Sequence, residues 1–257
     1  MKKYLIPAVM AVILALTACS PGGGSSDGKQ YGYFVYPGTD WGMTKDELFD
    51  AIGKTEEDLT VVAEMTDETN TAYVQEETFL GVPANIVYHF KRLSPTDSWY
   101  LDSVQATYSG ANADYEARYA AFLKITEDQG IPYEAGAVRR TRTEKDADGN
   151  ETSKDVISDE LLYAEGAART LVTTTIQSEA KIADLPENIQ DSAAAYYEVN
   201  AAPEGVTADS YSDMPLSSAS FWYGVNYSDS GEAEVTVLTI TMYGQVADIM
   251  QYAAQNK

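Results

Sequence analysis

The sequence has very little cysteine, histidine or positive charge. Its 257 residues include one cysteine, so no intrachain disulfide can form. The only histidine is His89, which excludes catalytic triads and zinc sites that need several imidazoles. Lysine and arginine together number 17 against 40 aspartates and glutamates, a formal net charge of -23. Proteins bind the nucleic-acid backbone largely through lysine and arginine, so we expect no nucleic-acid partner.

Long apolar segments and phosphate-binding loops are also scarce. Beyond the N-terminus, no apolar run reaches the roughly 18 residues that a membrane span requires. The glycine run at residues 22–24 does not lie between a strand and a helix, where a phosphate loop would be placed. We therefore expect no cofactor.

The N-terminus, by contrast, is strongly patterned. Two lysines at residues 2–3 precede a mostly apolar run at residues 5–16, which has the length of a secretory signal and is too short to cross a bilayer. Residues 16–19 then read Leu-Thr-Ala-Cys. This order resembles the lipobox of bacterial lipoprotein signal peptides. The resemblance implies that residues 1–18 are removed and that Cys19 is lipidated on its sulfur. An ordinary signal peptide with an incidental cysteine is the alternative.

This placement has physical consequences. Two acyl chains on Cys19 suffice for stable anchoring, where one is marginal. The predicted location is therefore the extracytoplasmic face of the cell membrane, with the membrane itself as one partner. Residues 19–30 are rich in glycine and serine, which predicts a flexible tether. About ten such residues reach about 18 Å, so the body at residues 31–257 would stay near the bilayer.

The body alternates helical and strand-like segments. Thr44 and Glu47 form a capping-box pattern, Met43 and Leu48 a hydrophobic staple, and Gly53 a helix stop, so we expect a helix after Thr44. Other expected helices lie at residues 113–129, from Pro186 to about residue 197 with Asp184 as cap, and around residues 246–253. Strands are expected at residues 60–65, 72–79, 85–91, 99–108, 138–143, 153–157, 161–164, 171–177, 221–227 and 235–243.

This order predicts an α+β fold with helices packed on an antiparallel sheet, in place of a doubly wound one. The pattern also suggests a helix-then-strands unit that occurs twice, near residues 41–108 and 113–177, with a subdivision near 110–135. The octapeptide at residues 41–48 and the Leu-Gly-Val-Pro-Ala run at 80–84 resemble the helix-then-sheet unit of small envelope lipoproteins, similar to the beta-lactamase-inhibitor-protein-like and BamE-like group. The resemblance covers about residues 41–110 and implies a binding or scaffolding role without catalytic residues. The octapeptide also reads as a good helix start and nothing more.

Three patterns could carry chemistry. His89 shares a strand face with Lys91, which predicts a solvent-facing side chain, and the sequence supplies no nucleophile for it. Asp146, Asp148 and Asn150 cluster as oxygen ligands do in calcium loops, but they depart from the EF-hand spacing and fit a polar hairpin turn equally well. Paired carboxylates recur along the chain, but a sequence with 40 acidic residues contains such pairs by chance.

Aromatic pairs are the remaining signal. Trp99, Tyr196 and Trp222 each adjoin another ring in the sequence, so one ring of each pair could face outward and bind a protein or a sugar. The leading hypothesis is a non-catalytic lipoprotein that binds an envelope protein or a cell-wall component. A small-ligand or calcium-binding lipoprotein is the alternative, and a hydrolase with a carboxylate pair comes third.

Overall fold

The computed structural model describes residues 35–128, 139–145, 148–155, 169–178, 180–200, 211–227 and 233–255. Cys19, the predicted tether, Asp146, the expected strand at 161–164 and the expected turn at 229–231 lie outside the described residues. None of the described helices has the length and apolarity needed to span a bilayer.

The first helix begins and ends where the sequence predicts. In α1 (Lys45–Ile52), the Thr44 hydroxyl accepts a hydrogen bond from the Glu47 backbone, and the Glu47 carboxylate accepts one from the Thr44 backbone. Gly53 ends the helix in the left-handed conformation, with φ of 67°. Local side-chain chemistry thus sets both ends of α1.

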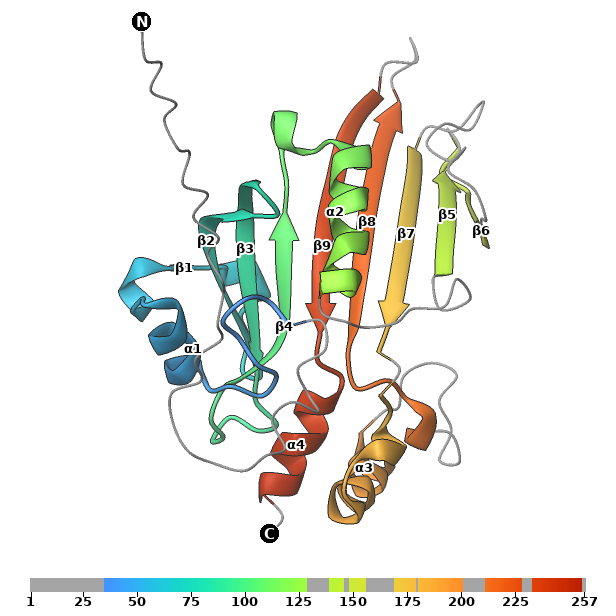
Figure 1. Ribbon diagram of the computed structural model, residues 1–257. Coiled ribbons are helices and arrows are strands. Elements are labelled where there is room, and N and C mark those ends of the chain that lie inside the picture. Colours follow the sequence, from blue (N-terminus) through green and yellow to red (C-terminus); the bar gives the residue numbers. More distant parts are fainter. Residues whose placement is uncertain are drawn as a thin grey trace, which may run out of the picture.

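Nine strands form one antiparallel sheet in the order β1-β2-β3-β4-β9-β8-β7-β5-β6 (Figure 1). The antiparallel ladders and the helices packed on them confirm the predicted α+β class. The strands are β1 (Thr60–Val61), β2 (Asn70–Phe79), β3 (Val82–Lys91), β4 (Tyr100–Thr107), β5 (Arg139–Lys145), β6 (Glu151–Asp155), β7 (Arg169–Gln177), β8 (Ser218–Tyr227) and β9 (Ala233–Tyr243). The last strand, β9, therefore lies between β4 and β8 and joins the strands of the two halves of the chain.

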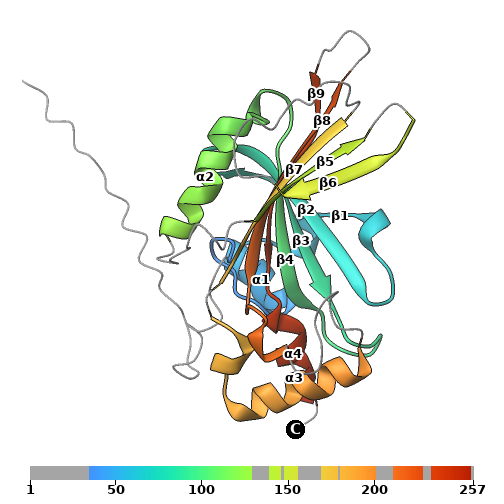
Figure 2. The ribbon, with the colours of Figure 1, turned by 90° about the vertical axis from the view of Figure 1, so that its right-hand side faces the viewer.

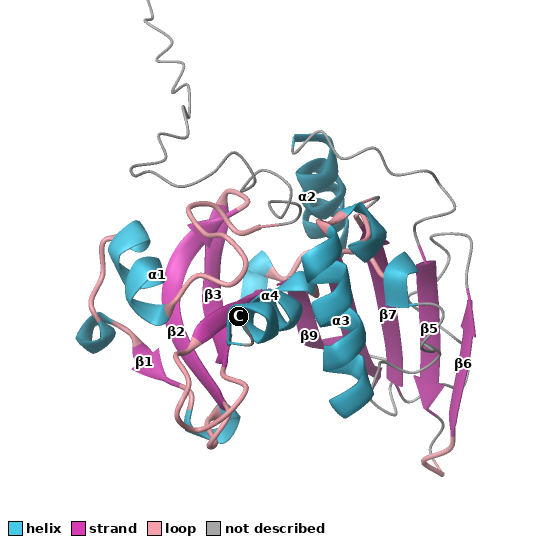
Figure 3. Cartoon of the chain, turned by 90° about the horizontal axis from the view of Figure 1, so that it is seen from below, coloured by secondary structure: helices cyan, strands magenta, loops and turns pink. Residues whose placement is uncertain are grey.

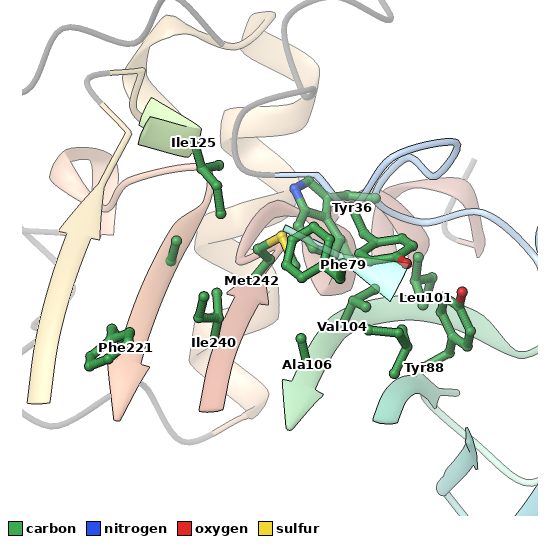
Figure 4. Packing of buried hydrophobic residues seen from close by; sticks show 14 of the residues in the cluster. Tyr36, Phe79, Tyr88, Leu101, Val104, Ala106, Ile125, Phe221, Ile240 and Met242 are labelled. Atoms are coloured by element: carbon green, nitrogen blue, oxygen red, sulfur yellow. The ribbon is translucent and has the colours of Figure 1, made fainter. Parts of the chain in front are cut away.

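One face of the sheet carries the hydrophobic core. Its side chains alternate as predicted: Ile86, Tyr88 and Phe90 of β3 are all essentially buried. The buried cluster continues through β4, β9 and β8 to Phe221. Figure 4 shows Tyr88, Ala106, Ile240 and Phe221 within this cluster. This face is called the core face below.

Helices cover the core face through aromatic contacts. Phe49 of α1 packs edge-on against Tyr73 and Phe90. The second helix, α2 (Tyr115–Asp128), packs Tyr119 and Phe122 against Phe221. Figure 2 shows α2 on this side of the sheet.

Two further helices lie at one end of the sheet, below the strands in Figure 1 and in the foreground of Figure 3. They are α3 (Glu187–Val199) and α4 (Val246–Gln255), and Tyr196 of α3 contacts Tyr252 of α4 edge to face. Gln251 of α4 donates to the Gly42 carbonyl at 3.2 Å, which ties the C-terminal helix to the loop before α1. α4 is thus fixed against the loop at Gly42.

The structure corrects two expected strand boundaries. The segment at 60–65 is a strand only at Thr60–Val61, because a 3₁₀ helix at Ala63–Met65 follows the last ladder bond from Val62 to Ala72. The turn expected at residues 80–83 is shorter, since β3 already begins at Val82 and only Leu80 and Gly81 turn the chain. Both turn residues have positive φ, as a tight two-residue hairpin loop requires.

The start of α3 also differs from the prediction by one position. Pro186 is the N-cap residue, in place of the first helical residue, and α3 continues to Val199. Asp184 does not cap this helix because its carboxylate accepts from the Lys181 backbone at 2.8 Å and closes the preceding 3₁₀ turn, Ile182–Asp184.

Candidate functional site

A polar cavity lies where the ends of β3, β4 and β9 meet α3 and α4. Its volume is about 200 Å³. Charged and aromatic side chains dominate its wall: Lys91, Asp102, Asp248, Tyr196, Tyr197 and Tyr243. We call it the lysine–aspartate cavity.

An ion-pair cluster forms the centre of this wall. The Lys91 Nζ atom lies 3.0 Å from Asp102 Oδ2 and 3.6 Å from Asp248 Oδ2. Asp248 also accepts hydrogen bonds from the hydroxyls of Tyr100, at 2.8 Å, and Tyr196, at 3.1 Å. Tyr100 and Asp248, which are 148 positions apart in the sequence, thus share one hydrogen-bonded network.

A bulge and a glycine bring these residues together. The ladder between β3 and β4 pairs His89 with Ser103 and Phe90 with Leu101, so Asp102 has no partner in β3. The Gly244 backbone N–H donates to the Asp102 carbonyl at 2.8 Å. Gly244 then leads into α4, whose first turn carries Asp248.

Only glycine fits at position 244. A Cβ atom there would lie 2.4 Å from the Cγ and Cδ2 atoms of Trp41, far inside contact distance. Trp41 is itself only 3% exposed, so its ring has little room to move. The packing of Trp41 on Gly244 therefore sets the position of the cavity wall.

Burial and pairing decide the ionisation of the cluster. Burial opposes the charge on Lys91, but the carboxylates of Asp102 and Asp248 outweigh it and raise the lysine pKa. Burial also raises the pKa of Asp102, in spite of the nearby ammonium. For the phenol of Tyr196, burial and the charge of Asp248 raise the pKa, and burial raises that of Tyr197 to about 12. At neutral pH, Lys91 stays cationic and the phenols stay protonated.

This set of groups suits binding better than bond cleavage. Glycosidases need one carboxyl as acid and a second that is free to act as nucleophile or base. In the cavity both carboxylates contact Lys91, and Asp248 also accepts two phenol hydrogen bonds. The groups present can hold an ion or a hydrogen-bonding ligand.

The second face of the sheet continues from the cavity. Ladder pairs align Ser103, Tyr243 and Ser218 in one row, and Gln105, Thr241 and Ser220 in the next. Trp222 pairs with Thr239 one row further on. We call this surface the hydroxyl face. Its serines and threonines are buried, whereas Trp222 and Tyr243 are each 37% exposed.

The three predicted aromatic residues occupy different places. Trp222 lies on the hydroxyl face, and Tyr196 lines the lysine–aspartate cavity. Trp99 precedes β4 and packs under the Arg92 guanidinium, 4.2 Å from the ring centroid. The structure therefore gives each of the three a different environment and does not bring them together.

His89 lies on the predicted strand face, but it is partly buried and does not face solvent freely. Burial and the charge of Lys91 lower its pKa, so it is neutral at neutral pH. The solvent-facing expectation is wrong to that extent, because Ser103 and Ala72 pair with His89 from both neighbouring strands.

The calcium prediction remains a prediction. Asp148 and Asn150 are exposed at the turn between β5 and β6, and Asp146 lies outside the described residues. Across the parts of the chain that the structure describes, no group of three or more acidic, histidine or cysteine side chains could hold a metal ion.

The comparisons with known proteins add no relative. No protein-family model, curated protein or solved structure matches this chain. The envelope-lipoprotein resemblance therefore stays a prediction from the sequence. Sequence reasoning missed Asp102 and Asp248, because nothing in their local sequence separates them from the other acidic residues; the shared face of His89 and Lys91 was the nearest signal.

Proposed function

We propose that this chain is a lipid-anchored binding protein on the extracytoplasmic face of the cell membrane. It binds an envelope protein or a cell-wall component and does not transform it. The sequence pattern that ends at Cys19 supports the location. The observation that carries the binding role is the lysine–aspartate cavity, in which Lys91 and the phenols keep their protons and both carboxylates are paired.

The anchor can be tested on the full chain. Expression in a bacterium, detergent-phase partitioning and mass spectrometry should find a lipidated Cys19 at the mature N-terminus. The variant Cys19→Ser should lose the lipid and leave the detergent phase, whereas the control Ser20→Ala should keep both properties. A free thiol at Cys19 in the unmodified protein contradicts the proposed location.

The binding role has a separate test. A photo-crosslinking residue at position 222 samples the hydroxyl face, and one at Val61, which is 47% exposed on β1, samples a distant edge. Irradiation of living cells should give a defined adduct from position 222 and none from position 61. Equal adducts from both positions, or none from either, count against a partner on this face.

The cavity also favours a second candidate, a small-ligand binder. A polar cavity of about 200 Å³ accommodates a small ligand, and its wall holds charged groups from three elements. Binding of such a ligand is compatible with a macromolecular partner, since Tyr243 belongs to both the cavity wall and the hydroxyl face.

A further inference from the structure

The charges in the lysine–aspartate cavity do not balance. Two carboxyl groups, those of Asp102 and Asp248, face a single ammonium group, that of Lys91. The surrounding tyrosines are neutral, and the chain as a whole carries a formal charge of -23. Both the cavity and the long-range field of the protein therefore favour a cation.

The hydrogen bonds of the cavity wall leave acceptors in excess. Asp248 accepts hydrogen bonds from Tyr100 and Tyr196 and forms an ion pair with Lys91 at 3.6 Å, so both of its oxygens have partners. On Asp102, Lys91 lies 3.0 Å from Oδ2, and the carboxylate also accepts from its own backbone N–H. The side-chain donor to Oδ1 is the Ser103 hydroxyl at 3.5 Å, the far limit of a hydrogen bond.

A buried amide in the same wall shows the same shortage of donors. Gln245 donates its Nε2 to Ser218 at 2.6 Å, but its Oε1 atom is buried without a hydrogen-bond partner. A buried acceptor without a donor costs free energy. Because Gln245 lines the cavity, a donor group on a ligand there can satisfy this acceptor.

Aromatic rings complete the wall. Tyr196, Tyr197 and Tyr243 line the cavity, and the faces of phenol rings attract cations. Lys91 itself illustrates the chemistry, because its alkylammonium group is already held by the two carboxylates. The Lys91 ammonium contacts Oδ2 of Asp102, so Oδ1 can accept a hydrogen bond from a second ammonium group.

We propose that the lysine–aspartate cavity binds the primary ammonium group of a small organic molecule or of an amino-bearing envelope sugar. The ammonium donates to Asp102 Oδ1 and Gln245 Oε1, and the tyrosine rings pack against the attached carbon. This proposal rests on the proposed binding function and names the chemistry of its ligand. A primary ammonium fits because it brings one charge and three donors.

Calorimetric titration of the full chain in detergent tests the chemistry with two matched pairs. Ethanolamine and choline differ in N–H donors, and glucosamine and N-acetylglucosamine differ in charge on one ring. Ethanolamine or glucosamine should bind saturably, and at least about tenfold more tightly than its matched partner, since a charge-assisted hydrogen bond is lost in the partner. Binding of glucosamine but not ethanolamine identifies the sugar source, and the reverse identifies the small molecule.

Two variants locate the site. Asp102→Asn should weaken binding by about tenfold or more. Glu77→Gln removes the same charge from a distant cavity beside Tyr36 and should leave the affinity unchanged. The comparison of the paired ligands on the unmodified chain remains valid even if the Asp102 variant does not fold.

Several results overturn the proposal. Equal heats for ethanolamine, choline and sodium chloride indicate screening of surface charge only, and absence of saturation excludes a site. An equal loss of affinity in Asp102→Asn and Glu77→Gln shows that binding depends on the net charge of the protein and not on this cavity. Any of these results, combined with intact lipidation and a defined adduct at position 222, refutes the ammonium ligand alone; absence of the adduct as well refutes the binding function.

Discussion

Replacing Gly244 with alanine should strongly destabilise the fold. The new methyl carbon would lie 2.4 Å from two ring carbons of Trp41, whereas carbon atoms pack at about 3.5–4.0 Å, so the ring or the backbone must move by about 1 Å. The backbone at 244 is held on both sides, by the bond to Asp102 and by the bond that Ala247 donates to the Gly244 carbonyl. Overpacking of this kind costs about 1–3 kcal/mol, and we expect the upper end.

Urea and thermal unfolding of the purified chain measure this effect. A loss of about 3 kcal/mol corresponds to a fall in Tm of roughly 6–12 °C for a domain of this size. The control is Gly81→Ala, where a Cβ meets nothing within 4 Å and only the φ of 83° is unfavourable. That variant should lose about 1–2 kcal/mol, from the left-handed backbone alone.

A double-mutant cycle separates the two causes. In a Trp41→Leu background, Gly244→Ala should cost much less than in the parent, because the colliding ring is gone, while the cost of Gly81→Ala should not change. If Gly244→Ala costs the same in both backgrounds, or less than about 1 kcal/mol in the parent, the argument from Trp41 packing is wrong.

Two further predictions concern local hydrogen bonds. Thr44→Ala removes the cap of α1 and should lower the free energy of unfolding by about 1 kcal/mol in urea titrations, and an unchanged midpoint would refute the capping argument. Asp67 accepts from the backbones of Thr69 and Asn70 and from the Asn70 amide, which lower its pKa to about 2. Its contribution to stability is therefore complete above the unfolded pKa of 3.8 and is lost as the pH falls toward 2. Carboxyl NMR titration should find the low midpoint, and a value near 3.8 contradicts these contacts.

Local patterns in the sequence predicted most of the elements. The cap at Thr44 and the stop at Gly53 depend on side chains within one turn, so the helix could be predicted in detail. The hairpin of β5 and β6 followed from polar turn residues between two strand-like segments. The alternation of Ile86, Tyr88 and Phe90 identified the core face, because the alternation lies within a single strand and needs no information from distant residues.

Competing local contacts explain the errors. Asp184 has the right type for a helix cap, yet it closes the 3₁₀ turn before Pro186. The stretch after Val61 has strand-like residues, yet the bond from Met65 to Val62 curls it into a 3₁₀ helix. In both places two local structures suit the sequence, and tertiary contacts decide between them.

The candidate site could not be read from the sequence. Lys91 and Asp102 come from neighbouring strands of one hairpin, but Asp248 reaches them only because β9 inserts beside β4 and leads into α4. Strand order is a long-range property, and no local pattern in the chain encodes it. Tyr196 was selected as an aromatic candidate, but its partner Asp248 depends on the same topology.

The central position of β9 in the sheet has a consequence for how the protein folds. Until β9 is available, β4 and β8 each lack one neighbouring strand, and the core face of the sheet is interrupted between them. Completion of the sheet requires contacts of very large sequence separation, which slow folding. A chain that emerges with its N-terminus first can thus complete this sheet only after β9 is available.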